Sequence, residues 1–325
     1  MAPADPLGRG VLARTEPIGH HAGSIIACGT IATGHPDHRV GRAGPSPDGT
    51  VPAMITDRPA REGLDLAREL ERAVERNEFG LEYQPIIDLQ SGVIAGVEAL
   101  LRWRHPLLGT IAPGDYLPIA EETGLIVPIG ERMIDVSSRQ LRTWHLGFSR
   151  MQGLALHVNV APRQLAERGF ARLVESMLDA NDTSPVSLTL ELGPGSTEHL
   201  EACLELRDLG VSMALEDFGT GSKLDDLRRL PVSAVKLHPS FVALAAGPAE
   251  DVAFAQSLLS LAQARDLVTI GKGVETRDQA RRLAAMGCDL AQGYLYSKPL
   301  GPEGIGTLLA RGRVSFAPGI ARIAR

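Results

Sequence analysis

The sequence is poor in the features that mark several classes of protein. Aromatic residues make up only 4% of its 325 residues, which argues against a stacking platform for single-stranded nucleic acid. Its three cysteines are an odd number at wide spacing, which is typical of reduced thiols rather than of a disulfide framework. No apolar run approaches about 18 residues, so no membrane span is expected. We therefore expect a cytoplasmic globular protein without a nucleic-acid partner.

Charge and composition divide the chain into three parts. Residues 1–58 contain nine glycines and seven prolines, which predicts a disordered N-terminal tail. Residues 313–325 carry three arginines and no acid, which indicates a basic C-terminal tail. The folded domain is expected over 59–312. Within it, residues 59–310 carry 24 basic and 34 acidic residues, a net charge of −10. An anion would need metals or well-placed cations to bind there.

The folded part alternates short apolar runs with helical periodicity. Candidate strands cover 81–89, 93–103, 155–160, 186–192, 211–216, 233–238, 267–272 and 289–292. Candidate helices cover 113–122, 129–146, 162–180, 197–208, 223–230, 249–264, 276–286 and 302–311. About eight strands in roughly 250 residues is the size of a closed (β/α)₈ barrel. A doubly wound open sheet is the alternative, although no Gly-x-Gly-x-x-Gly follows the first strand.

Polar side chains stand at the carboxyl ends of these strands, where a barrel places its chemistry. They would form an oxygen-rich cage of Glu98, Asn159, Glu191, Glu216, Asp217 and Glu275. Such ligands suit Mg²⁺ or Mn²⁺, and a nearby arginine and lysine suggest phosphoryl chemistry. The alternative for each acid is structural: a helix cap, or an ion pair such as Glu98 with Arg102, which share one strand face.

The same residues lie in a series of motifs that resembles the EAL domain family. The series runs through Glu98-Ala99-Leu100, VNVAPRQL, LEDFGTG, AVKLHPSF, GVET and AQGYLYSKPL, in that order. The resemblance implies a modified (β/α)₈ TIM-like barrel of α/β class whose first strand runs antiparallel. It also implies cyclic di-GMP as ligand, and metal-dependent hydrolysis of one phosphodiester to linear pGpG.

The resemblance assigns roles by motif position. It implies metal ligands at Glu98, Asn159, Glu191, Glu216 and Asp217. It implies catalytic side chains at Lys236, which would hold the attacking water, and at Glu275. It implies a nucleotide pocket lined by Gln84, Leu101, Arg102, Pro113, Glu275 and Gln292, with Arg102 on a phosphate.

Several departures from the family pattern bear on turnover. Glu216 replaces an aspartate, so its carboxylate reaches one methylene further. Lys272 replaces a glutamate that assists the water, and a cation there repels metal ions. His238 removes another acid, and Pro194 stands in the place of a second Glu. The loop after Gly221 is one residue shorter than usual. Lys272 and His238 thus put the occupancy of the Mg²⁺ or Mn²⁺ site in question.

Three functions follow from these patterns. The favoured one is binding of cyclic di-GMP in bacterial signalling with weak or no hydrolysis. The alternatives are an active phosphodiesterase that produces pGpG and a protein-interaction module that binds no nucleotide. A homodimer and a protein partner stay open, and residues 1–58 reveal no input signal.

Overall fold

The computed structural model describes residues 65–220 and 223–313. The tail predicted over 1–58 lies outside these residues, as do residues 59–64 and 314–325. The first two residues of the segment for which a shortened loop was predicted, 221 and 222, also lie outside them.

The strands of the described residues form one closed sheet. They are β1 (Phe79–Asp88), β2 (Ile94–His105), β3 (Gly109–Ile111), β4 (Ala155–Val160), β5 (Leu188–Leu192), β6 (Ser212–Phe218), β7 (Ala234–Leu237), β8 (Val268–Gly271) and β9 (Leu290–Ala291). Their order is β1-β9-β8-β7-β6-β5-β4-β2-β3, and an additional β1–β2 pairing closes the ring. Eight strands therefore make a barrel, while β3 extends the outer end of β2 as a hairpin. The open-sheet alternative is wrong.

The first strand runs against its two neighbours. β1 pairs antiparallel with β2, where Gln84 lies opposite Glu98, and antiparallel with β9, where Ile87 lies opposite Ala291. The other barrel pairings, from β2–β4 around to β8–β9, are parallel. This confirms the expected barrel with an antiparallel first strand.

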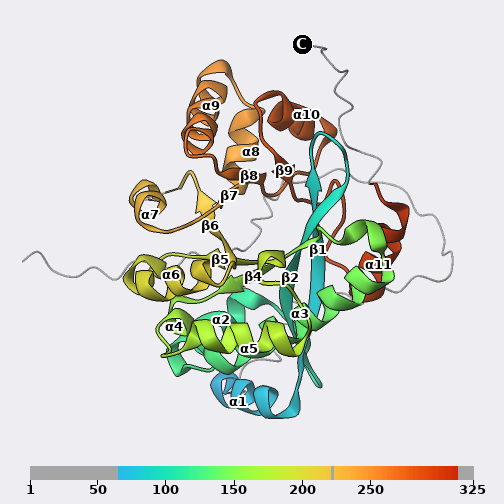
Figure 1. The fold of residues 1–325 in the computed structure, drawn as a ribbon, viewed down its shortest axis with the longest axis vertical. Coiled ribbons are helices and arrows are strands. Elements are labelled where there is room, and N and C mark those ends of the chain that lie inside the picture. The colour runs from blue at the N-terminus through green and yellow to red at the C-terminus, as the bar shows by residue number, and fades with distance from the viewer. Residues whose placement is uncertain (1–64, 221–222, 314–325) are drawn as a thin grey trace, which may run out of the picture. The chain divides into compact units, whose positions relative to one another are not determined.

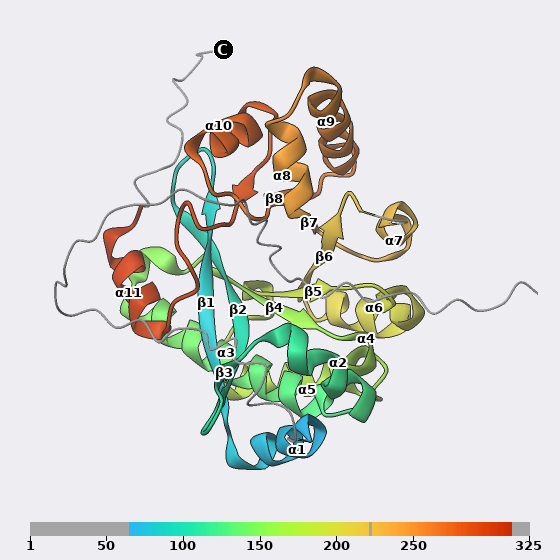
Figure 2. The same cartoon turned by 180° about the vertical axis from the view of Figure 1, so that it is seen from behind.

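Helices surround the strands (Figures 1 and 2). They are α1 (Leu66–Arg76), α2 (Pro113–Thr123), α3 (Ile126–Gly147), α4 (Pro162–Leu165), α5 (Phe170–Ala180), α6 (Leu200–Asp208), α7 (Lys223–Arg229), α8 (Pro239–Ala245), α9 (Ala249–Gln263), α10 (Arg277–Ala285) and α11 (Pro302–Arg311). Helices α3 and α11 pack beside β1, whereas α8, α9 and α10 group beside β7–β9. Within residues 65–220 and 223–313, no helix combines the length and apolar character needed to span a bilayer.

Two apolar clusters hold these elements together. The larger one joins buried side chains from the barrel strands to the inner faces of the surrounding helices. The smaller one joins Leu70 of α1 to Trp103 and Tyr116, whose rings meet edge-on with centroids 5.6 Å apart. This smaller cluster anchors the chain that enters β1. Strands β1 and β2, which carry site residues, therefore contribute side chains to both apolar clusters.

One local expectation needed correction, and two short elements were not predicted. The helix predicted over 162–180 is interrupted between α4 and α5, because Gly169 adopts φ +81°, which does not continue a right-handed helix. Strand β3 and helix α8 were not predicted, since three and seven residues are too short to show a clear period. Helix α8 begins after His238, whose side chain accepts from Ser240 N at 3.2 Å. His238 is thus a helix cap.

Candidate metal and nucleotide site

The predicted acids converge at the carboxyl ends of the parallel strands. Glu98 of β2, Glu191 of β5 and Glu216 of β6 are all buried. Each offers a carboxylate oxygen, and these oxygens lie within 4.8 Å of one another. We call these three residues the acidic triad. Three carboxylates at this separation repel one another unless cations lie among them.

Lys236 of β7 supplies one such cation, and its side chain is fully buried. Its Nζ lies 2.9 Å from Glu98 Oε2 and 2.5 Å from Glu191 Oε1. It lies 3.2 Å from Glu216 Oε1. Burial acts to lower the pKa of Lys236, but the three carboxylates outweigh it and raise that pKa well above its usual value. Lys236 is therefore a permanent cation inside the triad.

The pKa values of two triad carboxylates shift in opposite directions. Burial acts to raise the pKa of Glu98, but Lys236 and Lys272 outweigh it and lower that pKa. Burial and the neighbouring Glu98 instead raise the pKa of Glu191 well above its usual value. The two lysines thus favour ionisation of Glu98, whereas burial beside Glu98 disfavours ionisation of Glu191, which a bound cation would reverse.

Lys272 is a second cation, and it lies where an acid was expected from the motif. Its Nζ donates to Glu216 Oε2 at 2.6 Å and lies 3.5 Å from Asp217 Oδ1. Asp217 has φ +52° and lies at an irregularity in the β6–β7 pairing. Burial acts to lower the pKa of Lys272, but Glu216 outweighs it and raises that pKa. The Glu216–Asp217 pair is therefore already neutralised in part by the chain itself.

An amide network completes the floor of the site. Gln292 Nε2 donates to Glu98 Oε2 at 2.6 Å and to Gln84 Oε1 at 3.0 Å. Gln84 Nε2 in turn donates to Ser297 O at 3.0 Å. Asn159 Nδ2 donates to Glu98 Oε1 at 3.0 Å, although Asn159 is otherwise exposed. Gln292, Asn159 and Lys236 thus supply three donors to the Glu98 carboxylate.

The remaining predicted residues are not part of the acidic triad. Arg102 Nε donates to Glu82 Oε2 at 2.8 Å, so the Glu98–Arg102 ion pair considered as an alternative is wrong. Leu101 is half-buried between the two apolar clusters, and Pro113 is half-buried at the start of α2. Glu275 is exposed before α10. The structure thus leaves Glu275 outside the acidic triad.

Comparisons with known proteins place this architecture. The model of the EAL domain family matches residues 67–299. The chain is 38% identical over 250 residues to the bifunctional diguanylate cyclase/cyclic di-GMP phosphodiesterase MucR of Pseudomonas aeruginosa. That match covers 75% of this chain and 36% of MucR, so the chain spans only about a third of that relative. The chain belongs to the EAL domain family.

Solved EAL structures superpose on the barrel. The PaMucR phosphodiesterase in its c-di-GMP complex aligns with TM-score 0.69 at 36% identity, covering 74% of this chain and 100% of that one. The cAMP- and cyclic-di-GMP-bound form of the EAL enzyme Bd1971 aligns with TM-score 0.72 at 29% identity, covering 78% and 70%. These structures support the barrel fold of this chain.

The unpaired oxygens of this site indicate whether it suits a divalent cation. Glu191 Oε2 and Gln292 Oε1 are buried and have no hydrogen-bond partner among the described residues. Buried acceptors without a donor are costly, and a cation or its bound water would satisfy them. Together with the other triad oxygens they suit Mg²⁺ or Mn²⁺. The Glu216–Asp217 pair fits a second cation poorly, because the Lys272 ammonium contacts both carboxylates.

Two residues of the site were missed from the sequence. His157 is buried two positions before Asn159, and its Nδ1 lies 3.0 Å from Glu191 Oε1. Glu82 precedes Gln84 by two positions and pairs with Arg102. Both lie at even spacing from a predicted residue, so the two-residue period of a strand was the signal that could have found them.

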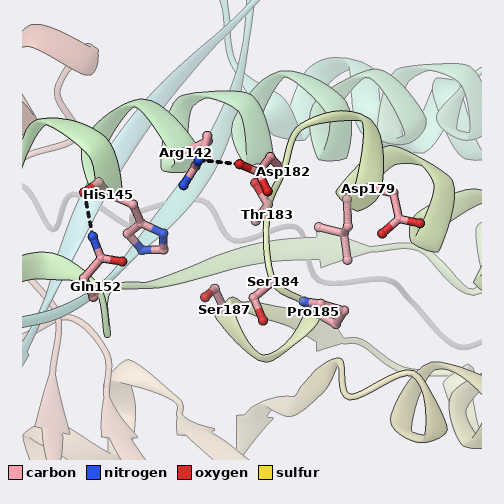
Figure 3. A pocket seen from close by; sticks show the side chains of 10 residues that line it. Arg142, His145, Gln152, Asp179, Asp182, Thr183, Ser184, Pro185 and Ser187 are labelled. Carbon is pink, nitrogen blue, oxygen red and sulfur yellow. Dashed lines mark hydrogen bonds and ion pairs between the residues drawn. The ribbon is translucent and has the colours of Figure 1, made fainter.

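A separate cavity of about 370 Å³ lies beside the amino end of β5 (Figure 3). Its polar lining is paired internally: Arg142 pairs with Asp182, and Gln152 Nε2 donates to His145 O at 2.9 Å. Because EAL chemistry lies at the carboxyl ends of the strands, this cavity is not the site indicated by the triad.

Proposed function

We propose that this chain binds cyclic di-GMP and hydrolyses it weakly or not at all. The PaMucR and Bd1971 structures, both of which contain cyclic di-GMP, support cyclic di-GMP as the ligand. The observation that carries the proposal of weak or absent hydrolysis is the contact of Lys272 Nζ with Glu216 Oε2 at 2.6 Å. A cation sits where turnover would need an acid.

The pocket side chains support nucleotide binding. Arg102 is the cation that would contact a phosphate, which an acidic domain needs in order to hold an anion. Gln292 donates to Glu98, and Gln84 accepts a second hydrogen bond from the same Gln292 amide. The rim residues Leu101, Pro113 and Glu275 would border the nucleotide.

The acidic triad, with Asn159 and Asp217 beside it, would hold Mg²⁺ or Mn²⁺. Such a cation would polarise a phosphoryl oxygen and favour ionisation of a bound water. Lys236 would then keep that water in place, and Glu275 would assist from the rim.

Hydrolysis would be slow for two physical reasons. Loss of general-base assistance costs about 10²–10⁴-fold in rate, and Lys272 cannot accept a proton from water while it is an ammonium. A misplacement of about 1 Å in a reacting group can cost about 10²-fold, and Glu216 reaches one methylene further than an aspartate. Either change would slow hydrolysis but would still allow cyclic di-GMP to bind.

The test has two steps on the full chain. Calorimetric titration with cyclic di-GMP in Ca²⁺ measures affinity while turnover is suppressed, and a chromatographic assay for pGpG in Mg²⁺ or Mn²⁺ then measures hydrolysis. Micromolar or tighter binding with little product supports the proposal. Turnover above about 1 s⁻¹ would instead establish the active phosphodiesterase, and no binding at high ligand would leave the protein-interaction module.

A further inference from the structure

The polar centre has two halves that share Glu216. In the first, the triad surrounds Lys236. In the second, Lys272 contacts Glu216 Oε2 and Asp217 Oδ1. Lys272 is 17% exposed, so its ammonium is largely shielded from water and its charge acts on its neighbours with little screening.

The two halves differ in how many of their oxygens are left unpaired and could bind a metal ion. Around the triad, Glu191 Oε2, Glu216 Oε1 and Gln292 Oε1 are buried and have no hydrogen-bond partner in the part of the chain that the structure describes, although Lys236 Nζ lies 3.2 Å from Glu216 Oε1. Lys236 contacts one oxygen of each triad carboxylate, yet Glu191 Oε2 and Gln292 Oε1 stay unpaired within that part, so these two oxygens are available to bind a cation. Around Asp217, one oxygen of each carboxylate already lies against the same ammonium. A divalent cation there would have to displace Lys272 or accept its repulsion.

A count of formal charges points the same way. Glu98, Glu191, Glu216 and Asp217, counted as ionised, contribute −4, and Lys236 with Lys272 contributes +2. The remaining −2 matches one divalent cation. A glutamate at position 272 would change the sum to −5 + 1 = −4, which matches two.

We propose that the Lys272 ammonium takes the place of a second divalent cation, so that this chain binds a single one, at the acidic triad. The inference deepens the proposed function, since a single cation would not stabilise both the attacking and the leaving oxygen as two cations do. It rests on that function only for the nucleotide, because the number of bound cations can be measured without any nucleotide.

The experiment is equilibrium dialysis of the full chain against Mn²⁺, followed by elemental analysis. Wild type should bind one Mn²⁺ per chain, both with and without cyclic di-GMP. Lys272→Glu should bind two. Arg265→Glu makes the same charge change at an exposed position after α9 and should stay at one.

Three results would overturn the proposal: two cations in wild type, none in wild type, or one in a folded Lys272→Glu. If Lys272→Glu fails to fold, Lys272→Gln takes its place, and a second Mn²⁺ should then bind more weakly than the first. A Lys272→Gln chain limited to one cation would contradict the assignment. Rapid hydrolysis by wild type would refute the proposed function, yet leave a count of one intact.

Discussion

Arg102 donates from Nε to Glu82 Oε2 at 2.8 Å, across the antiparallel pair of β1 and β2. Its Nη1 also donates to Leu101 O at 3.0 Å. The guanidinium is thereby held in one orientation. Glu82 offsets part of its charge, so a phosphate at Arg102 would bind against a competing carboxylate.

Changes at this pair should move nucleotide affinity in opposite directions. Arg102→Ala should weaken cyclic di-GMP binding by about tenfold or more, because a hydrogen bond to a charged group contributes about 1.5–3 kcal/mol. Glu82→Gln should leave affinity unchanged or tighten it a few-fold, since the competing charge is gone. Titration in Ca²⁺ measures both, and unchanged affinity in Arg102→Ala would remove the pocket assignment.

Replacing the second lysine should restore turnover. Lys272→Glu removes a cation and supplies an acid next to Glu216, so pGpG formation in Mn²⁺ should rise by about 10²–10⁴-fold, the usual range for general-base assistance. Adding Glu216→Asp should raise it further by shortening the carboxylate. Arg265→Glu is the matched control and should not change the rate. No gain in the folded double variant would show that Lys272 and Glu216 do not limit turnover.

The barrel could be predicted because its signal is local. Strand β4 matches its predicted range, 155–160, since its apolar run is bounded by a glycine and a proline. The acids at the strand ends were found in the same way, because parallel strands all end at one rim. The antiparallel direction of β1 came from the family resemblance, as direction leaves no trace in composition.

The pairing of charges could not be predicted, because it depends on register between strands. Sequence spacing suggested Glu98 as the partner of Arg102, but the register places Gly80 opposite Arg102 and brings Glu82 within reach. Lys236 likewise meets carboxylates from β2, β5 and β6, which are separated in sequence. Such contacts follow from closure of the barrel.

His157 should make stability depend on pH. Burial, helped by Lys236, lowers its pKa to about 3, whereas an unfolded histidine has a pKa of about 6.5. Between these values the unfolded chain binds a proton that the folded chain excludes, so this contribution to stability falls as pH falls from about 6.5 to about 3. The slope approaches about 1.4 kcal/mol per pH unit below pH 6.

His157→Gln isolates this contribution, because glutamine can keep a hydrogen bond to Glu191 but does not titrate. Urea unfolding between pH 4.5 and 7 should give a shallower pH dependence in the variant, by about one proton. Parallel curves for the two proteins would mean that His157 titrates normally in the folded chain.

Lys236 should be needed for stability until a metal replaces its charge. Its ammonium is fully buried among three carboxylates, so Lys236→Met leaves Glu98 and Glu216 without it. Removing one partner of a buried ion pair costs about 3–5 kcal/mol, and this loss should appear in the free energy of unfolding. Lys272→Met, closer to solvent, should cost less. Mn²⁺ at about 100 times its dissociation constant should return about 2.7 kcal/mol to Lys236→Met, because the cation binds only the folded triad. A variant as stable as wild type, or one that Mn²⁺ does not stabilise, would show that the triad is not held together by charge.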